Sequence, residues 1–430
     1  MWFLMDLPAF ARVLLVFCII LIAIRRKMAL GNAFLLGSVV LGLFFGLGLI
    51  PMAKTMYQSI IDPQTLSLAI IVSLILILSN SLEKAGQMQR LLHSFRGLIK
   101  NPRINIVVFP ALIGLLPMPG GAIFSAPMVK DLGTGIKLSK SKLSYINYWF
   151  RHIWEYCWPL YPGILLVTIL AKINIVNFVL FTLPITLVAV LLGYWPLQKG
   201  SDWNHSNRET ARQQSIYPFF IELTPILLVI VPGLILGVVL SYMLPQLSIA
   251  KELGLHISLC LGIIWVWISN QFDWKRILKL LSSFEILKMI YLVATILVFK
   301  GLLEHSHAAE EISKELIEFN VPLLFIAMFL PFLIGIISGY TLAFVGVSVP
   351  ILIPLIQSYG ESAFMYPYAM LIMVSGFAGV LLSPLHLCYI LSNQYFETKI
   401  SSVYKHLMIP TIGLISFSIA YFLVSYRFFF

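Results

Sequence analysis

Long runs of apolar residues, separated by short polar segments, occupy most of the chain. Runs of about 17–25 apolar residues are long enough to cross a bilayer as helices. A polar segment at 200–216 lies near the middle and predicts a linker between a first half, 1–199, and a second half, 217–430. Ten membrane-spanning helices are predicted: 7–24, 30–50, 64–82, 144–171, 175–198, 217–244, 254–271, 285–303, 365–393 and 406–429.

Two further apolar regions, 104–132 and 321–357, contain helix breakers near their centres. The first is interrupted at Pro117 to Gly121 and the second at Ser338 to Tyr340. Each arm of the first region has about 14 residues, or about 20 Å of helix, which is too short for a hydrocarbon core of about 30 Å. The pattern predicts a re-entrant helical hairpin in each region. The alternative is one kinked span followed by an amphipathic loop.

The two halves resemble each other in the order of their elements. Phe109–Gly114 (FPALIG) matches Leu330–Gly335 (LPFLIG), and the same displacement places the first three predicted spans over the sixth to eighth. Each half then has five membrane-spanning helices and one hairpin, with a broken helix at 144–171 in the first half and at 365–393 in the second. Because each half crosses the membrane five times, an odd number, the second half enters the membrane from the side opposite to the first. The fold class predicted is an all-α polytopic membrane protein built as an inverted repeat.

Composition and charge agree with a membrane location. The chain is 60% hydrophobic and 11% charged, whereas soluble domains carry about 25% charged residues. The net charge of +11 comes from short loops between apolar runs, so it does not indicate nucleic acid as a partner. Basic loops accumulate on the cytoplasmic side. Most of the 29 Lys and Arg fall there if the N-terminus is outside and the central linker is cytoplasmic, which predicts a multi-pass protein of the inner membrane.

The interruptions in the two hairpins are the first candidate binding residues. Glycine leaves the backbone accessible, and a helix that begins at a break presents partial positive charge to an anion. Close helix packing is the alternative role for such small residues. The candidates for substrate binding are Gly120, Gly121, Ser125, Ser338, Gly339 and Thr341.

The broken helices supply a second group of candidates. Proline removes a backbone donor and frees a carbonyl one turn earlier. The predicted helix breaks are Pro117, Pro119, Pro159, Pro162 and Pro384, and Ser375 and Ser383 are further candidates for substrate binding. Arg151, His152 and Glu155 form the sharpest charged cluster, and intramembrane charges are rare and usually functional. We expect them to set charge or proton coupling; the alternative is that they begin a helix at the membrane interface.

No enzyme motif, cofactor or metal site is predicted. The sequence has no H-E-x-x-H, G-x-S-x-G or P-loop motif and no C-x-x-C pair or other Cys/His ligand spacing. The four cysteines are interpreted as small packing residues, and a structural role is favoured for His386 and Asn393. We therefore expect no catalytic residues; the lipid bilayer and a small molecule or ion are the expected partners.

Two motifs resemble a known family. Met118–Pro127 (MPGGAIFSAP) and Trp149–Pro162 (WFRHIWEYCWPLYP) are similar to a family of uncharacterised prokaryotic integral-membrane proteins grouped with the ion-transporter superfamily. That superfamily includes citrate, dicarboxylate, gluconate and arsenite permease-like carriers. The resemblance implies two hairpins and two unwound helices around a central site, often in a homodimer with a moving transport domain. The Ser-Asn-Thr tips of sodium-coupled carboxylate carriers are absent from the sequence.

These features predict a secondary active transporter for a small, anionic solute, coupled to protons or sodium and working by an elevator-like mechanism. A cation/proton antiporter is the alternative within transport. An intramembrane enzyme or a non-transporting membrane subunit is the alternative from another class.

Overall fold

The computed structural model describes residues 7–96, 98–99, 101–118, 120–136, 138–197 and 215–428, and these residues form helices and no strand. In the first half the helices are α2 (Ala9–Arg25), α3 (Leu30–Phe44), α4 (Leu49–Ile61), α5 (Pro63–Lys84), α6 (Gln87–Phe95), α7 (Pro102–Gly114), α8 (Ala122–Gly135), α9 (Lys140–Trp149), α10 (Pro162–Leu170) and α11 (Ile175–Gly193). In the second half they are α12 (Tyr217–Met243), α13 (Ala250–Ser269), α14 (Trp274–Leu281), α15 (Phe284–His305), α16 (Ala308–Glu318), α17 (Leu323–Ser338), α18 (Thr341–Ser358), α19 (Met365–Leu382), α20 (Leu387–Tyr395) and α21 (Ile400–Phe428). Short 3-10 helices span Phe150–Tyr156, Trp195–Leu197 and Ser362–Phe364.

Local sequence explains where several helices begin. The Asp62 carboxylate accepts hydrogen bonds from the backbone N–H groups of Gln64 and Thr65, at 3.0 and 3.1 Å, and α5 then starts at Pro63. Asn101 and Pro102 form the same kind of start for α7. A side-chain acceptor satisfies an N–H group that has no partner inside the helix, and proline at the first helical position needs none.

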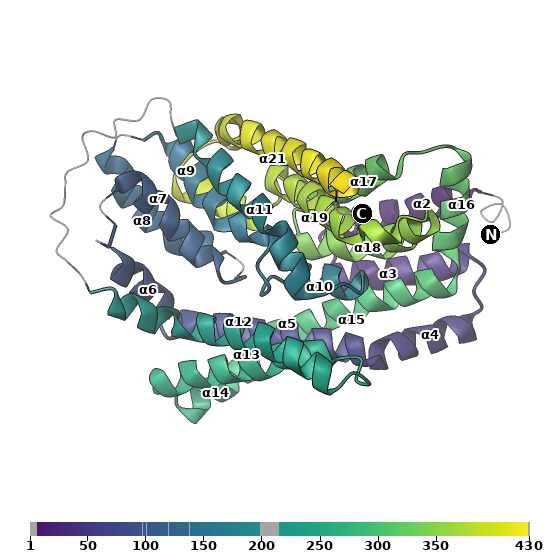
Figure 1. Ribbon diagram of the computed structural model, residues 1–430, viewed down its shortest axis with the longest axis horizontal. Helices are drawn as coiled ribbons and strands as arrows, with labels where there is room; N and C mark the ends of the chain where they lie inside the picture. The colour runs from purple at the N-terminus through teal and green to yellow at the C-terminus, as the bar shows by residue number, and fades with distance from the viewer. Residues whose placement is uncertain are drawn as a thin grey trace.

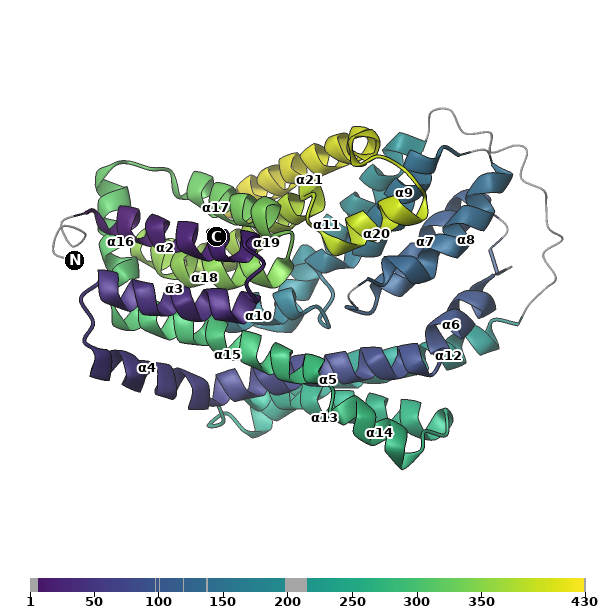
Figure 2. The same ribbon diagram turned by 180° about the vertical axis from the view of Figure 1, so that it is seen from behind.

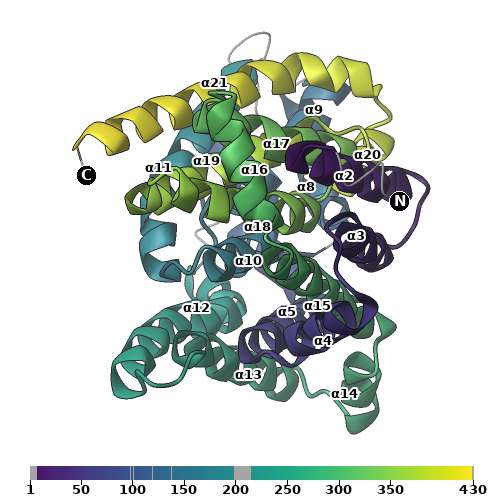
Figure 3. The same cartoon turned by 90° about the vertical axis from the view of Figure 1, so that its right-hand side faces the viewer.

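The helices form two groups that meet along α5 and α15. In Figure 1, α4, α5, α12, α13 and α14 run along the lower side of the molecule, with α7 to α11, α19 and α21 above them. Figures 2 and 3 show the same separation from behind and from one end. Helices α5 and α15 pack against each other; α5 also contacts α10, and α15 contacts α18. The two helices therefore join the lower group to the upper one.

Both predicted hairpin regions are interrupted pairs of packed helices. Helix α7 ends at Gly114 and α8 begins at Ala122, and the two pack together. Helix α17 ends at Ser338, α18 begins at Thr341, and these also pack together. Pro117 lies in the first non-helical segment, whereas Pro119 falls outside the described residues.

The two predicted broken helices are also interrupted. After α9, a 3-10 helix runs to Tyr156, and Pro159 lies in the non-helical segment before Pro162 begins α10. In the second half, α19 ends at Leu382 and α20 begins at Leu387, with Pro384 between them.

Eight helices in the described part of the chain are long and apolar enough to cross a membrane. They span Pro63–Lys84, Ile175–Leu197, Tyr217–Met243, Ala250–Ser269, Trp274–His305, Thr341–Ser358, Ser362–Tyr395 and Ile400–Arg427. The chain is therefore an all-helical polytopic membrane protein, as the sequence predicts.

The predicted number of ten spans differs from these eight candidates. Helices α2 and α3 have only 17 and 15 residues, and the span predicted at 144–171 is divided by its 3-10 segment. Conversely, Thr341–Ser358 qualifies by length and composition, although the sequence assigns it to a hairpin. The single span predicted at 30–50 is in fact interrupted by a turn. Gly46 (φ 70°) follows α3, and a separate helix, α4, begins at Leu49. Of the predicted linker, residues 200–214 lie outside the described part of the chain.

Helices α12 and α13 cross so closely that glycine is required at their contact. A Cβ atom built at Gly254 would overlap the backbone of α12, at Gly233 O (2.6 Å) and Gly237 Cα (2.7 Å). Backbone atoms cannot rotate away, so a larger residue must separate the two helices.

Gly254→Ala is expected to destabilise the protein by about 1–3 kcal/mol, because the added methyl group overpacks this crossing. Thermal unfolding in detergent should show a lower midpoint for this variant. The control is Gly48→Ala, where the new Cβ would meet Pro51 at an ordinary 3.4 Å. Equal midpoints for the two variants would contradict the close crossing.

Candidate functional site

The helix breaks of both halves meet at one pocket. Its cavity volume is about 170 Å³. Residues from both hairpins, both interrupted helices and the central pair α5 and α15 line it: Val72, Ile75, Leu76, Pro117, Met118, Gly120, Arg151, His152, Glu155, Tyr161, Pro162, Gly163, Met289, Gly339, Tyr340, Thr341, Leu342, His386, Leu387 and Cys388.

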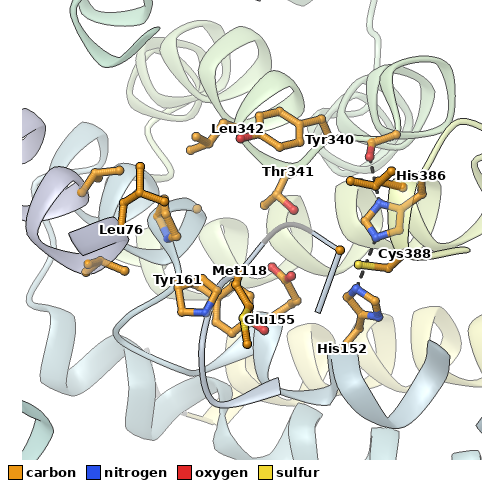
Figure 4. A pocket seen from close by; sticks show the side chains of 18 of the residues that line it. Leu76, Met118, His152, Glu155, Tyr161, Tyr340, Thr341, Leu342, His386 and Cys388 are labelled. Carbon is orange, nitrogen blue, oxygen red and sulfur yellow. Dashed lines mark hydrogen bonds between the residues drawn. The ribbon is translucent and has the colours of Figure 1, made fainter. Parts of the chain in front are cut away.

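The pocket has an apolar wall and a small set of polar groups. Val72, Ile75 and Leu76 of α5 and Met289 of α15 contribute apolar side chains. The polar groups come from the interrupted helices and the second hairpin, and Figure 4 shows several of them facing the same space. Apolar walls with a few placed polar groups are typical of ligand sites.

Side chains of the first interrupted helix bind the free backbone carbonyls at the end of α7. The last carbonyls of a helix have no partner inside it, and in a membrane protein they must find one within the protein. Three such bonds are present: Trp154 Nε1 to Ala111 O (2.8 Å), Tyr161 hydroxyl to Gly114 O (2.7 Å) and Trp158 Nε1 to Leu115 O (2.8 Å). Beyond the helix, Arg151 Nη2 donates to Met118 O (2.5 Å), which also accepts from the Gly121 N–H. The motif Trp149–Pro162 thus supplies the donors that stabilise the first hairpin tip.

Arg151 packs directly against the first hairpin tip, because the glycines there have no side chains. A Cβ at Gly121 would overlap the Arg151 guanidinium, and one at Gly114 would overlap the Arg151 carbonyl. Arg151 is 2% exposed, and its Nε has no hydrogen-bond partner among the described residues. A buried N–H group without a partner is costly, so this donor is available to an acceptor bound in the pocket.

A carboxyl group lies on the same interrupted helix. Glu155 is 7% exposed, lines the pocket and points towards the Thr341 hydroxyl at the start of α18. The pocket therefore contains one buried guanidinium and one buried carboxyl group, and the carboxyl group faces the second hairpin.

The second hairpin tip is stabilised through a histidine. Gly339 has a left-handed backbone (φ 66°), which ends α17, and its N–H donates to Gly335 O at 2.8 Å. Its carbonyl accepts from His386 Nδ1 at 2.8 Å. The other ring nitrogen, His386 Nε2, lies 3.2 Å from His152 Nε2 (Figure 4). His386, at the start of α20, therefore connects the second hairpin tip to the interrupted helix of the first half.

The structure brings some of the predicted site residues together and leaves others apart. Those lining the pocket are Gly120, Gly339, Thr341, Arg151, His152 and Glu155, together with Pro117 and Pro162, and Gly121 packs behind them on Arg151. The predicted serines Ser125, Ser338, Ser375 and Ser383 are not among the lining residues.

Ser125 belongs instead to a buried polar network beside the pocket. Its hydroxyl donates to Asn147 Oδ1 at 2.7 Å, and Asn147 Nδ2 donates to Ser392 Oγ at 2.9 Å. Ser144 donates to Asn393 Oδ1 at 2.8 Å. This network joins α8, α9 and α20, which indicates a packing role for Ser125.

Sequence reasoning missed several residues of the pocket. Cys388 is interpreted there as a packing residue and His386 as structural, yet both line the pocket with His152. Tyr161 and Met118 lie within the two family-like motifs, but the sequence alone did not identify them as site residues. The available signal was the position of His386 and Cys388 just after the break at Pro384.

Arg151→Lys is expected to loosen the first hairpin tip, because a lysine cannot reproduce the guanidinium geometry that reaches Met118 O. Loss of a charge-assisted hydrogen bond of about 1.5–3 kcal/mol should speed amide exchange at Gly120 and Gly121 about tenfold or more. Hydrogen–deuterium exchange measures this. The matched control is Arg12→Lys, where the arginine also donates to a backbone carbonyl, Phe44 O; unchanged exchange in Arg151→Lys would contradict the assignment.

Comparison with known proteins identifies the family. No curated protein matches the chain. The family described as "Protein of unknown function (DUF401)" matches residues 9–424, nearly the whole chain. The protein therefore belongs to this family.

Proposed function

We propose that this protein is a secondary active transporter that moves a small, anionic solute across the cytoplasmic membrane, coupled to protons or sodium. The observation that carries the proposal is a single pocket where interrupted helices from both halves meet around buried Arg151 and Glu155. Interrupted helices around a shared site are a recurring feature of secondary transporters. Charged side chains within membrane-spanning segments usually mark a substrate or ion path.

An anionic solute is supported by the donors around the tips. Arg151 Nε is buried without a partner, and α8 and α18 both begin next to the pocket, at Ala122 and Thr341. Helix N-termini carry partial positive charge and free N–H groups. Glu155 is the coupling residue in this proposal, because its carboxyl group can bind a proton or Na⁺ beside the solute.

We also propose that the two halves form an inverted repeat with re-entrant hairpins. Helices α2 to α11 recur in order as α12 to α21, and three pairs begin 221 positions apart: α5 and α15 (63 and 284), α6 and α16 (87 and 308), α7 and α17 (102 and 323). Three contacts between the halves occur twice, with the two halves exchanged. Helix α3 packs on α15, and its counterpart α13 packs on α5. In the same way, α2 packs on α16 and α12 on α6, while α8 packs on α20 and α18 on α10.

A shared packing detail supports the same repeat. Gly114 and Gly335 end the matching FPALIG and LPFLIG motifs. A Cβ at Gly114 would overlap the carbonyl of Arg151, and one at Gly335 would overlap the carbonyl of Gly376. In each half, then, the first arm of the hairpin packs through a glycine on the backbone of the interrupted helix.

The mechanism we propose is elevator-like. The pocket lies between the hairpin tips and the central helices α5 and α15, so movement of the upper group along these helices would carry the pocket from one side to the other. A homodimer would hold the lower group still. We further propose that the family belongs to the ion-transporter superfamily. The N-terminus outside and the linker cytoplasmic complete this proposal, as the distribution of Lys and Arg predicts.

The inverted repeat predicts opposite sides of the membrane for Lys54 and Lys275. Both side chains are exposed, and they occupy equivalent positions, in α4 and α14. In a background with the exposed cysteines Cys18 and Cys260 replaced by serine, Lys54→Cys should react with an impermeant thiol reagent from outside and Lys275→Cys only after the cells are opened. Labelling of both from one side would contradict the inversion.

Glu155→Gln is expected to abolish ion-driven uptake, because the neutral amide cannot take up a proton and has no negative charge with which to hold Na⁺. The measurement is solute uptake into proteoliposomes, over a panel of small anions, with a proton or sodium gradient imposed. Thermal shift identifies which anions bind, and binding should survive in the variant. The control is Glu83→Gln, an exposed glutamate of α5. Unchanged gradient dependence in Glu155→Gln would remove the coupling role, and uptake of cations alone would favour the cation/proton antiporter.

A further inference from the structure

Three side chains of types that can bind a metal ion converge at the wall of the pocket, and none of them is predicted from the sequence to do so. They are His152 in the 3-10 helix of the first half, and His386 and Cys388 at the start of α20 in the second (Figure 4). One ring nitrogen of each histidine and Cys388 Sγ all lie within 4.8 Å of one another, and the two Nε2 atoms are 3.2 Å apart. His152 and Cys388 are buried, at 3% and 6% exposed.

The hydrogen bonds of the two histidines fix where their protons lie. His152 Nδ1 is 2.7 Å from Tyr148 O, and His386 Nδ1 is 2.8 Å from Gly339 O. A carbonyl oxygen only accepts hydrogen bonds, so each Nδ1 must carry the proton and donate it. In the neutral rings both Nε2 atoms are then bare acceptors.

These two acceptors face each other at 3.2 Å. Two lone pairs at this distance repel, so the arrangement calls for an electrophile between them. A histidine that binds a metal through Nε2 ordinarily donates its Nδ1–H to a carbonyl or carboxylate, which orients the ring. Both histidines have this second partner already.

The spacing fits a tetrahedral metal ion. With Zn–N bonds of about 2.0–2.1 Å, two nitrogen ligands lie about 3.3 Å apart in tetrahedral geometry, close to the observed 3.2 Å. Two imidazoles and a thiol are ligands for borderline-soft transition metals, whereas Mg²⁺ and Ca²⁺ prefer oxygen. We propose that His152, His386 and Cys388 form a binding site for a transition-metal ion, of which Zn²⁺ fits best.

The proposed site has an open fourth position towards the pocket. Zn²⁺ with one thiolate and two neutral imidazoles keeps a single positive charge, and Arg151 and Glu155 line the same space. An anion bound beside Arg151 Nε can occupy the fourth position; this step alone rests on the proposed function. The metal would also join the interrupted helices of the two halves, and through His386 it would support the second hairpin tip.

The test uses the purified full-length protein in detergent, stripped with a chelator and titrated with Zn²⁺, and separately with Co²⁺ as a spectroscopic probe. One ion per chain is expected, and the Co²⁺ form should show thiolate-to-metal charge-transfer absorption. Cys388→Ser should abolish that absorption, and His386→Gln should weaken binding about tenfold or more. Circular dichroism and size-exclusion chromatography check that each variant is folded.

Cys157→Ser is the matched control, because Cys157 is equally buried but contacts Thr186, at 3.1 Å, outside the cluster. It should bind Zn²⁺ and Co²⁺ like the unmodified protein. Absence of stoichiometric binding in the unmodified protein, or unaltered Co²⁺ absorption in Cys388→Ser, would overturn the site and leave a proton shared between the two histidines. These measurements need no solute or gradient. They therefore test the metal site independently of the proposed transport function.

Discussion

The structure depends on one constraint: every backbone carbonyl freed by a helix break inside an apolar protein must find a donor. Lipid offers none, and an unpaired polar group there costs several kcal/mol. At the end of α7 and just beyond it, the donors are the indole, phenol and guanidinium groups of the first interrupted helix. At the second tip, the carbonyl of Gly339 is satisfied by His386. The breaks can exist because a second interrupted element lies beside each of them.

This constraint makes the stabilising residues and the pocket residues largely the same. Arg151 holds the first tip and lines the pocket, and His386 holds the second tip and lines it from the other half. Movement of one tip would therefore move its donor and the shape of the pocket with it. A ligand that binds at Arg151 or between the histidines acts directly on the contacts that keep the breaks in place.

Glycine is needed where backbone meets backbone. Gly114, Gly335 and Gly254 each face carbonyl or amide groups of a neighbouring helix, which cannot move aside as a side chain can. Gly121 faces the guanidinium of Arg151 instead. Such contacts bring the hairpins close to the interrupted helices, and they give small residues at the candidate site a packing role. The predicted serines illustrate this, since Ser125 is bonded to Asn147 beside the pocket.

The sequence by itself determined the membrane class, most helices and the positions of the breaks, because hydrophobic run length, proline and glycine act locally on the backbone. It also identified Arg151, His152 and Glu155, since charge within an apolar run is visible in one dimension. It did not separate α3 from α4, where apolar residues continue through the turn at Gly46. Only the tertiary structure decided that His386, 234 residues from His152, lies against it at the wall of the pocket with Cys388 alongside. Such a site depends on how two distant chain segments pack, and no local pattern of residues encodes that distance.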